Sequence, residues 1–345
     1  MVETHSVLAA YIKDTWNVET KGIVEISEGS AKCFVIETEN KKFFFKIYQG
    51  KFDRSTLENE ILVCRYLIQK GFTVSCFIES TNNKYIETFC DSLCTLQVYI
   101  EGDAIRKFEV SKAQLMDSIR VLANLITAME DLPVRLPIGF DQEWFLEWSA
   151  NSAIDRYRNL LQKLDVNDEC YARISDDFKA KCEMIERFDP NLFDFSSLSV
   201  ENTHGDYNVL QLIFERDKVK AVIDFASCAR LPVSWEIIRS YTLSSPECRH
   251  GNIDIDGFIS YVREYMKIKK LCRSDLELMP YFYLYSLLRS TFGYKSYIEK
   301  RKNNIAVNEK DWNALEFAFW RTSMCKWLFD NADELSYKLR SIVSR

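Results

Sequence analysis

The residues best suited to chemistry lie in the segment 204–225, which reads HGDYNVLQLIFERDKVKAVIDF. Two short apolar runs within it are separated by four charged residues, a pattern that predicts a β-hairpin. Asp206 enters this hairpin and Asp224 leaves it, so the hairpin can bring the two carboxylates close together. Beside the amide of Gln211 they make a hard-oxygen site suited to Mg²⁺, in which one carboxylate is free to act as a base.

This segment resembles the catalytic segment of the aminoglycoside phosphotransferase and choline kinase family, whose members have a protein-kinase-like fold. The family pattern is H-G-D, an Asn five residues after the Asp, and I-D-F or I-D-W at the end of a hairpin. Residues 204–206 and 223–225 match it, whereas Gln211 stands where the family usually has Asn. The resemblance implies that His204 is structural and hydrogen-bonds the loop backbone. An ordinary turn followed by an ordinary strand-end aspartate is the alternative, but the two halves at this spacing favour the kinase interpretation.

A helix and three strands are predicted at the N-terminus, over residues 5–16, 22–27, 33–38 and 42–48. The turn between the first two strands, residues 27–32, contains Gly29 and Ser30. A glycine at such a hairpin tip can lay backbone amides against phosphates without obstruction by a side chain. Gly29 and Ser30 are therefore candidate nucleotide-binding residues, with a plain hairpin turn as the alternative.

Lys46 lies within the third predicted strand, where a buried ammonium is costly unless it is paired. It resembles the phosphate-contacting lysine of kinase-like folds, whose partner is a glutamate on a helix. Residues 57–70 have a helical pattern that ends at Gly71 and offers Glu58 and Glu60. Glu60 is preferred because it leads into the apolar face of the helix, whereas Glu58 is expected to face solvent. A strand-edge lysine is the alternative for Lys46.

Two further strands are predicted over residues 84–89 and 95–100. The second resembles the hinge strand of the family, which implies that the backbone groups of Val98 and Ile100 contact adenine. The N-terminal nucleotide-binding lobe is therefore expected to span residues 1–100. The catalytic and substrate-binding lobe would span residues 101–345, with a helical insertion at about 131–198.

The second half of the chain is predicted to be mainly helical, over residues 111–130, 143–164, 169–188, 253–268, 275–300 and 308–344, with another helix opened by Pro232. Within that helix, Glu236 and Arg239 can pair with each other or with the catalytic loop. Several acidic residues can line a site for a cationic substrate, although solvated helix faces are the better-supported alternative: Asp141, Glu143, Glu147, Asp155, Asp165, Asp168 and Glu169. The aromatic region 279–297 can form a cage for a quaternary amine, but core packing is the commoner use of such spacing.

The chain has 345 residues, 47% of them hydrophobic, and a net charge of −6. This length suits two lobes, and the acidic balance lacks the basic footprint of a nucleic-acid binder. The eleven cysteines are odd in number and lack zinc-site spacing, which indicates reduced thiols and a cytoplasmic location. No signal peptide and no apolar run of membrane-spanning length is recognised, so a membrane partner is not expected.

The resemblance implies an α+β, two-lobed kinase-like fold that transfers the terminal phosphoryl group of ATP to a hydroxyl group of a small molecule. Asp206 would accept or orient the hydroxyl proton, while Asp224 and Gln211 would hold Mg²⁺. Lys46, held by Glu60, would neutralise the phosphates. The acceptor is left open among an aminoglycoside, a choline-like amino alcohol, homoserine and another sugar, and a cationic molecule is compatible with the chain's acidity. The alternative is a kinase-like pseudoenzyme or regulatory module that binds nucleotide without transferring phosphate.

Overall fold

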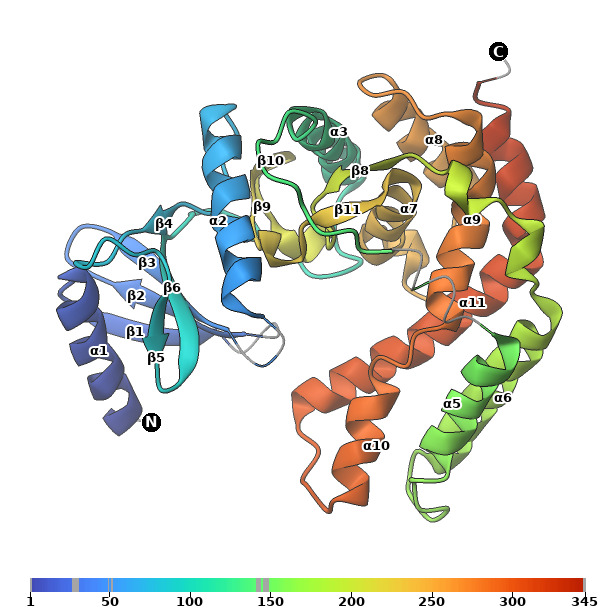
Figure 1. Ribbon diagram of the computed structural model, residues 1–345, viewed down its shortest axis with the longest axis horizontal. Coiled ribbons are helices and arrows are strands. Elements are labelled where there is room, and N and C mark those ends of the chain that lie inside the picture. Colours follow the sequence, from blue (N-terminus) through green and yellow to red (C-terminus); the bar gives the residue numbers. More distant parts are fainter. Residues whose placement is uncertain are drawn as a thin grey trace.

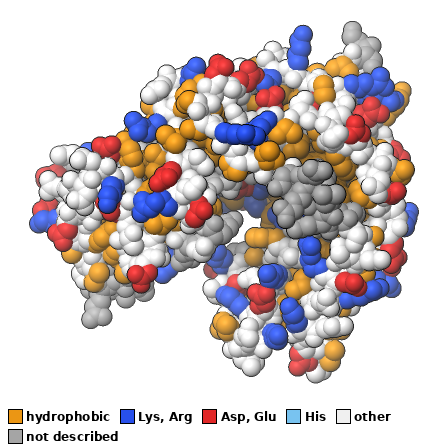
Figure 2. Space-filling model, in the orientation of Figure 1, with side chains coloured by type: hydrophobic (Ala, Val, Ile, Leu, Met, Phe, Trp, Pro, Cys, Tyr) orange, Lys and Arg blue, Asp and Glu red, His pale blue; other side chains and the backbone are white. Residues whose placement is uncertain are grey.

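The computed structural model describes residues 2–26, 31–48, 50, 52–140, 144 and 149–343. It has the expected α+β architecture, with an antiparallel sheet near the N-terminus and a larger, mainly helical part after it (Figure 1). Acidic and basic side chains are interspersed over the face seen in Figure 2. Within the described residues, no helix combines the length and the apolar character needed to cross a membrane.

The N-terminal sheet has the strand order β1-β2-β3-β6-β4, with β5 paired to β6. Its strands are β1 (Gly22–Ile26), β2 (Lys32–Glu37), β3 (Lys42–Ile47), β4 (Phe77–Ile78), β5 (Glu87–Phe89) and β6 (Ser92–Val98). Helix α1 (Val2–Trp16) buries Leu8, Ile12 and Trp16 against the sheet, where they pack with Phe34 and Phe45. This small apolar core is distinct from the large one in the rest of the chain.

Helix α2 (Arg54–Gln69) connects the sheet to the catalytic segment. The carboxylate of Asp53 caps its first turn by accepting a hydrogen bond from the Thr56 N–H (2.8 Å). The helix lies between the N-terminal sheet and the β9–β10 hairpin described below (Figure 1), and it packs on the short helix η4 (Phe225–Ser227). Since η4 directly follows Asp224, this packing holds the catalytic segment against the helix that adjoins the N-terminal sheet.

The predicted catalytic hairpin forms as β9 (Leu212–Glu215) and β10 (Lys218–Val222), and β7 (Asp103–Ala104) pairs with β9. Two strands that the hydrophobic pattern did not predict, β8 (Val200–Thr203) and β11 (Ala229–Pro232), pair with each other on either side of the catalytic segment. They escape detection because both are short and neither alternates clearly. Their pairing joins the two ends of the segment 204–228.

The remaining helices are α3 (Lys112–Ala128), α5 (Ala150–Leu161), α6 (Tyr171–Arg187), α7 (Val233–Ser244), α8 (Ile255–Met266), α9 (Arg273–Leu288), α10 (Tyr294–Lys302) and α11 (Glu309–Arg340), with short 3-10 turns η1 (Pro190–Leu192), η2 (Phe195–Ser197), η3 (Val209–Gln211) and η5 (Pro246–Cys248). They share one large apolar core. Most of the aromatic side chains between residues 281 and 297 are buried in it, so core packing is their main role.

The single helix predicted for residues 275–300 is wrong, because the chain breaks into α9 and α10. The break contains Gly293, whose φ of +85° is disfavoured for other residues. A Cβ atom there would lie 2.1 Å from the carbonyl oxygen of Ala314 in α11. The close approach of α11 therefore requires a glycine at the position just before α10, a constraint that local periodicity does not reveal.

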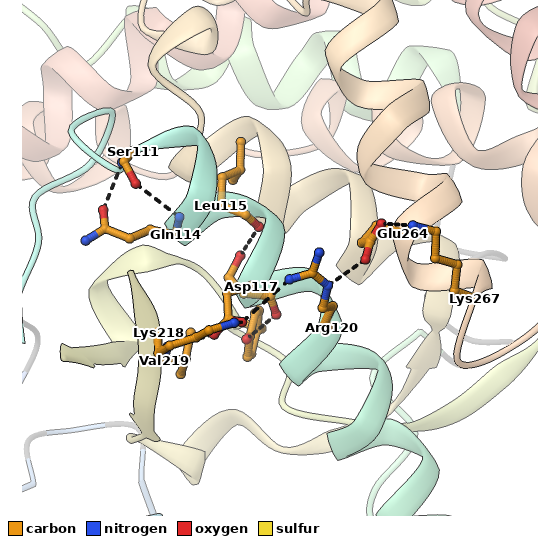
Figure 3. Close-up of polar contacts among 11 residues, drawn as sticks. Ser111, Gln114, Leu115, Asp117, Arg120, Lys218, Val219, Glu264 and Lys267 are labelled. Carbon is orange, nitrogen blue, oxygen red and sulfur yellow. Dashed lines mark hydrogen bonds and ion pairs between the residues drawn. The ribbon is translucent and has the colours of Figure 1, made fainter. Parts of the chain in front are cut away.

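A polar network holds the catalytic hairpin to helix α3 (Figure 3). The buried carboxylate of Asp117 accepts hydrogen bonds from Lys218 Nζ (2.7 Å) and from the Val219 N–H (2.9 Å) at the start of β10. Arg120, one turn further along α3, contacts Asp117 and also donates from Nε to Glu264 of α8 (2.5 Å). The network therefore connects the hairpin to two helices of the large core.

We predict that Asp117→Ala destabilises the protein by about 1–3 kcal/mol, because the Val219 N–H loses its partner in a partly buried place. The measurement is the free energy of unfolding from urea titration. The matched control is Asp155→Ala on α5, an exposed carboxylate that pairs with Arg158 one turn away. That control should change the free energy by less than about 0.5 kcal/mol. Equal effects of the two substitutions would contradict the anchoring role of Asp117.

Candidate active site

His204 connects the loop that carries Asp206 with the strand that leads to Asp224. Its ring is fully buried, Nδ1 accepts the Asp206 N–H (3.3 Å), and Nε2 is 2.9 Å from the carbonyl oxygen of Ile223. Since Nδ1 is the acceptor, the proton belongs on Nε2, which donates to Ile223. The imidazole thus bridges the backbones of Asp206 and Ile223, the structural role that the resemblance implied.

Gly205 allows these two segments to touch. Its φ is +77°, and a Cβ atom at this position would lie 1.9 Å from the carbonyl oxygen of Ser227. No side chain fits such a contact, so the glycine of the H-G-D motif is required by the close approach of η4. Asp224 itself has a left-handed conformation, with φ +63° and ψ +61°, which aspartate tolerates better than most residues.

Glu236 of α7 holds the catalytic loop in place through the loop's backbone N–H groups. It is fully buried, and its two carboxylate oxygens accept the His204 N–H (3.0 Å) and the Tyr207 N–H (3.2 Å). Burial raises the pKa of this carboxyl group, although His204 and the Tyr207 amide oppose the rise. Asn208 completes the loop by donating to the backbone carbonyl of Asp206 (2.7 Å). These bonds leave the Asp206 side chain as the part of the loop that faces outward.

The carboxylate of Asp206 lies between a guanidinium and an amide. Arg239 of α7 donates from Nη2 to Oδ1, and Gln211 donates from Nε2 to Oδ2 (3.2 Å). The Asp206 side chain is 33% exposed and that of Arg239 is 15% exposed. Pairing of Arg239 with the catalytic loop was one of the two options that its spacing from Glu236 offered. The structure has both residues contacting this loop.

Lys46 of β3 forms an ion pair with Asp224, at 2.6 Å from Nζ to Oδ1. The lysine side chain is 9% exposed and the aspartate side chain 40%. Burial opposes the charge of Lys46, but Glu60, Tyr48 and Asp224 outweigh it, so the pKa of Lys46 lies above its ordinary value. Residues separated by 178 positions are thus joined in one place.

The expected direct pairing of Lys46 with Glu60 needs correction, because the ion-pair partner of Lys46 is Asp224. Glu60 is buried, and its Oε2 accepts a hydrogen bond from the Tyr48 hydroxyl (3.0 Å). Burial raises the pKa of Glu60, and the nearby charge of Lys46 opposes this. Glu58, by contrast, is exposed on the other side of α2, as expected.

Gln211 lies at the base of the hairpin, where its carbonyl accepts the Ile223 N–H (2.9 Å). The side chain belongs to the same site as Asp206, to which its Nε2 donates, whereas the bond to the residue that precedes Asp224 is made by the Gln211 backbone. Among the described residues no three His, Cys, Asp or Glu side chains cluster as a metal site. A metal ion held here would need oxygen ligands from elsewhere as well.

The structure describes only two of the four other residues that were predicted to contact the nucleotide. The Val98 N–H donates to the carbonyl of Cys76 (2.8 Å), so this amide is already used, and Ile100 follows the end of β6. Gly29 and Ser30 lie outside the described residues. The same holds for Asp141, Glu143 and Glu147, which were considered for a cationic substrate.

Other acidic residues considered for that role are engaged elsewhere. Asp168 and Glu169 both pair with Arg301 of α10, and Asp155 pairs with Arg158. Asp165 accepts hydrogen bonds from Asn167 in its own turn. None of these four lines the cavity of about 400 Å³ that Arg239 borders.

Similar folds occur in solved kinase structures. An amicoumacin kinase in complex with AMP-PNP and Ca²⁺ is 12% identical, with a TM-score of 0.62, covering 94% of this chain and 93% of its own. A microcompartment-associated aminopropanol kinase is 11% identical, with a TM-score of 0.61 and coverage of 97% and 99%. A spectinomycin phosphotransferase in complex with ADP and spectinomycin is 13% identical, with a TM-score of 0.57 and coverage of 96% and 97%. These likenesses confirm the two-lobed, protein-kinase-like fold.

Sequence comparison agrees with the fold. A search of curated proteins gives no match. A sequence model described as the phosphotransferase enzyme family matches residues 22–264, a span that contains Lys46, the H-G-D motif, Asp224 and Arg239. The chain therefore belongs to the phosphotransferase enzyme family.

Proposed function

We propose that this protein is an ATP- and Mg²⁺-dependent kinase that transfers the terminal phosphoryl group to a hydroxyl group of a small molecule. The observation that carries the proposal is the convergence of Lys46, Asp206 and Asp224 at one hairpin. Phosphoryl transfer needs positioning and charge neutralisation more than covalent catalysis, and a lysine with two carboxylates supplies both. The complexes of two structural relatives with AMP-PNP and with ADP support a nucleotide cosubstrate.

In this proposal, residues 1–100 form the nucleotide-binding lobe and residues 101–345 the catalytic lobe. The chain enters the second lobe just before β7, which pairs with β9 of the catalytic hairpin. Lys46 contributes the positive charge for the phosphates, and the buried Glu60 raises its pKa and so keeps it protonated. Ile100 and the Val98 carbonyl remain the candidate backbone contacts for adenine.

The residues of the site fit a magnesium ion. The carboxylate of Asp224 already holds a cation, the Lys46 ammonium, at 2.6 Å. On the loop that His204 joins to Ile223, the residue before Asp224, the side chains of Asp206, Asn208 and Gln211 offer hard oxygen donors together with amide N–H groups. Mg²⁺ is usually bound by one or two carboxylates plus substrate phosphates, so Asp224 and Gln211 suffice as the protein's share. When bound there, the ion would neutralise charge on the nucleotide phosphates.

Asp206 is proposed to receive the proton of the acceptor hydroxyl. Arg239 pairs with Oδ1, whereas Oδ2 has only the longer Gln211 contact among the described residues, so Oδ2 is the oxygen available to the substrate. As the acceptor oxygen bonds to the terminal phosphorus, its proton passes to Oδ2 and ADP leaves. The loop bonds from His204 and Glu236 keep the carboxylate in place during this step.

We predict that Asp206→Asn lowers the rate of phosphoryl transfer by about 10²–10⁴-fold, because an amide accepts no proton at neutral pH. Affinity for ATP should change little, since Asp206 does not contact Lys46. The measurements are product formation with any acceptor that the wild type phosphorylates and ATP binding by calorimetry. Asp217→Asn, an exposed position at the tip of the same hairpin, is the matched control and should keep wild-type turnover. Full activity of Asp206→Asn would exclude Asp206 as the base.

We also predict that Gln211→Ala raises the Mg²⁺ concentration needed for half-maximal activity at least about threefold, whereas Gln211→Asn costs less. Asparagine keeps an amide oxygen of the kind that Mg²⁺ accepts, while alanine removes it. The measurement is initial rate against free Mg²⁺ at fixed ATP. An unchanged Mg²⁺ requirement in Gln211→Ala would show that the Gln211 amide serves only to orient Asp206.

A further inference from the structure

A cavity of about 400 Å³ opens beside Arg239, and Lys46 is not among its described lining residues. Its volume is in the range of small-molecule sites. Four arginines line it, from four different parts of the fold: Arg156 of α5, Arg239 of α7, Arg289 after α9 and Arg321 of α11. The described lining includes no aspartate or glutamate, although the chain as a whole has a net charge of −6. This concentration of positive charge therefore belongs to the cavity, not to the protein at large.

Two of these arginines keep unused hydrogen-bond donors in buried positions. Arg239 donates from Nη2 to Asp206, but its Nη1 is buried and has no hydrogen-bond partner among the described residues. Arg321 donates from Nη1 to the Ser290 hydroxyl (2.6 Å), but its Nε is likewise buried and without a partner in the described part of the chain. Buried donors of charged groups normally have partners, and a missing one is costly. Both atoms therefore point to a ligand with acceptor oxygens.

The cations also repel one another in the absence of a ligand. Burial lowers the pKa of Arg321 to about 10, with a further contribution from the charge of Arg239. Lys107 lies 3.8 Å above the ring of Phe317, which lines the cavity. Burial, with the charges of Arg239 and Arg321, lowers the pKa of Lys107 to about 8. Among the main contributions to these two shifts, Asp206 is the carboxylate that raises the pKa of both Lys107 and Arg321. A bound anion would relieve the repulsion.

The walls of the cavity are aromatic, which suits the non-polar faces of a small molecule. They include Phe140, Trp144, Trp235, Tyr283, Phe317 and Trp320. Arg289 lies 4.0 Å over the ring of Trp144 and Arg239 lies 5.2 Å from the ring of Trp235. Such stacking holds a guanidinium plane in one orientation, a geometry suited to bidentate contact with phosphate or carboxylate.

We propose that the phosphate acceptor carries an anionic oxygen group, a phosphate ester or a carboxylate, which binds between Arg321 and Arg239. The inference rests on the proposed kinase function and names the class of its acceptor. Arg239 contacts Asp206 on one side and the cavity on the other, so an anion held by the arginines places a hydroxyl of the same molecule toward Asp206. The expectation of a cationic acceptor gains no support from the described lining.

Sulfate is the first probe, because it is a dianion throughout the accessible pH range and needs no knowledge of the acceptor. Three tryptophans line the cavity, so sulfate binding at constant ionic strength should change tryptophan fluorescence. Arg321→Gln should weaken binding at least about tenfold. Arg156→Gln, at an exposed position that tolerates substitution, should weaken sulfate binding about threefold. This variant provides the test if Arg321→Gln fails to fold. Arg158→Gln, exposed on the same helix and outside the cavity, is the control and should bind as wild type.

Lys46→Met separates this anion site from the phosphate site of the nucleotide. Sulfate binding should persist in that variant. Loss of binding in Lys46→Met with retention in Arg321→Gln and Arg156→Gln would overturn the proposal, and so would the absence of binding to the wild type.

Acceptor screening provides the second test, with compounds that share a polyol but differ in charge: glycerol, glycerol phosphate, glycerate and aminopropanediol, and inositol beside inositol phosphate. ATP consumption should favour an anionic compound in each set, and Arg321→Gln should raise the KM for that compound more than it lowers kcat. Preference for the aminopropanediol would overturn the anionic acceptor while leaving the kinase function intact. If no compound is phosphorylated, the kinase function loses support, and the sulfate titration alone decides the anion site.

Discussion

The ion pair between Lys46 and Asp224 is the interaction on which the site depends. It joins a strand of the N-terminal sheet to the end of the catalytic hairpin, and α2 packs on η4 immediately beside it. A lysine buried in a sheet needs a carboxylate near it, because an unpaired buried charge is costly, and a left-handed backbone conformation costs free energy for an aspartate. The ion pair between the two residues offsets both costs. In the proposed function, the same two charges receive the phosphates and their metal ion.

The catalytic loop shows how a short motif acts through backbone geometry. His204 and Glu236 occupy the amides of the loop, and Gly205 admits the Ser227 carbonyl at a distance that excludes any side chain. These contacts leave the side chain of Asp206 partly exposed to solvent. Its pairing with Arg239 links the loop to the arginine-lined cavity, so one guanidinium belongs to both the proposed base and the proposed acceptor site.

The apolar pattern of the sequence predicted the catalytic hairpin. The resemblance of its motif to a known family predicted the fold class and the candidate residues Lys46, Asp206 and Asp224. The sequence did not predict the partner of Lys46, since Glu60 and Asp224 are both acidic and only the close packing of α2 on η4 decides which is nearer. Nor did it predict the cavity. Arg321 lies in a long helix 82 positions after Arg239, and only the packing of the helices brings the two together. The need for a glycine at Gly293, within the break between α9 and α10, was missed for a similar reason, because a distant carbonyl imposes it.

The measurement that tests the central claim most directly is a double-mutant cycle on nucleotide binding, with Lys46→Met, Asp224→Asn and the double variant titrated with ATP in the presence of Mg²⁺. If the two residues serve one set of phosphates, each single change weakens binding at least about tenfold. The double change then weakens it by clearly less than the product of the two, since contacting residues couple by about 0.5–3 kcal/mol. Wild-type affinity in either single variant, or strictly additive effects, would contradict the account of a single phosphoryl-transfer site.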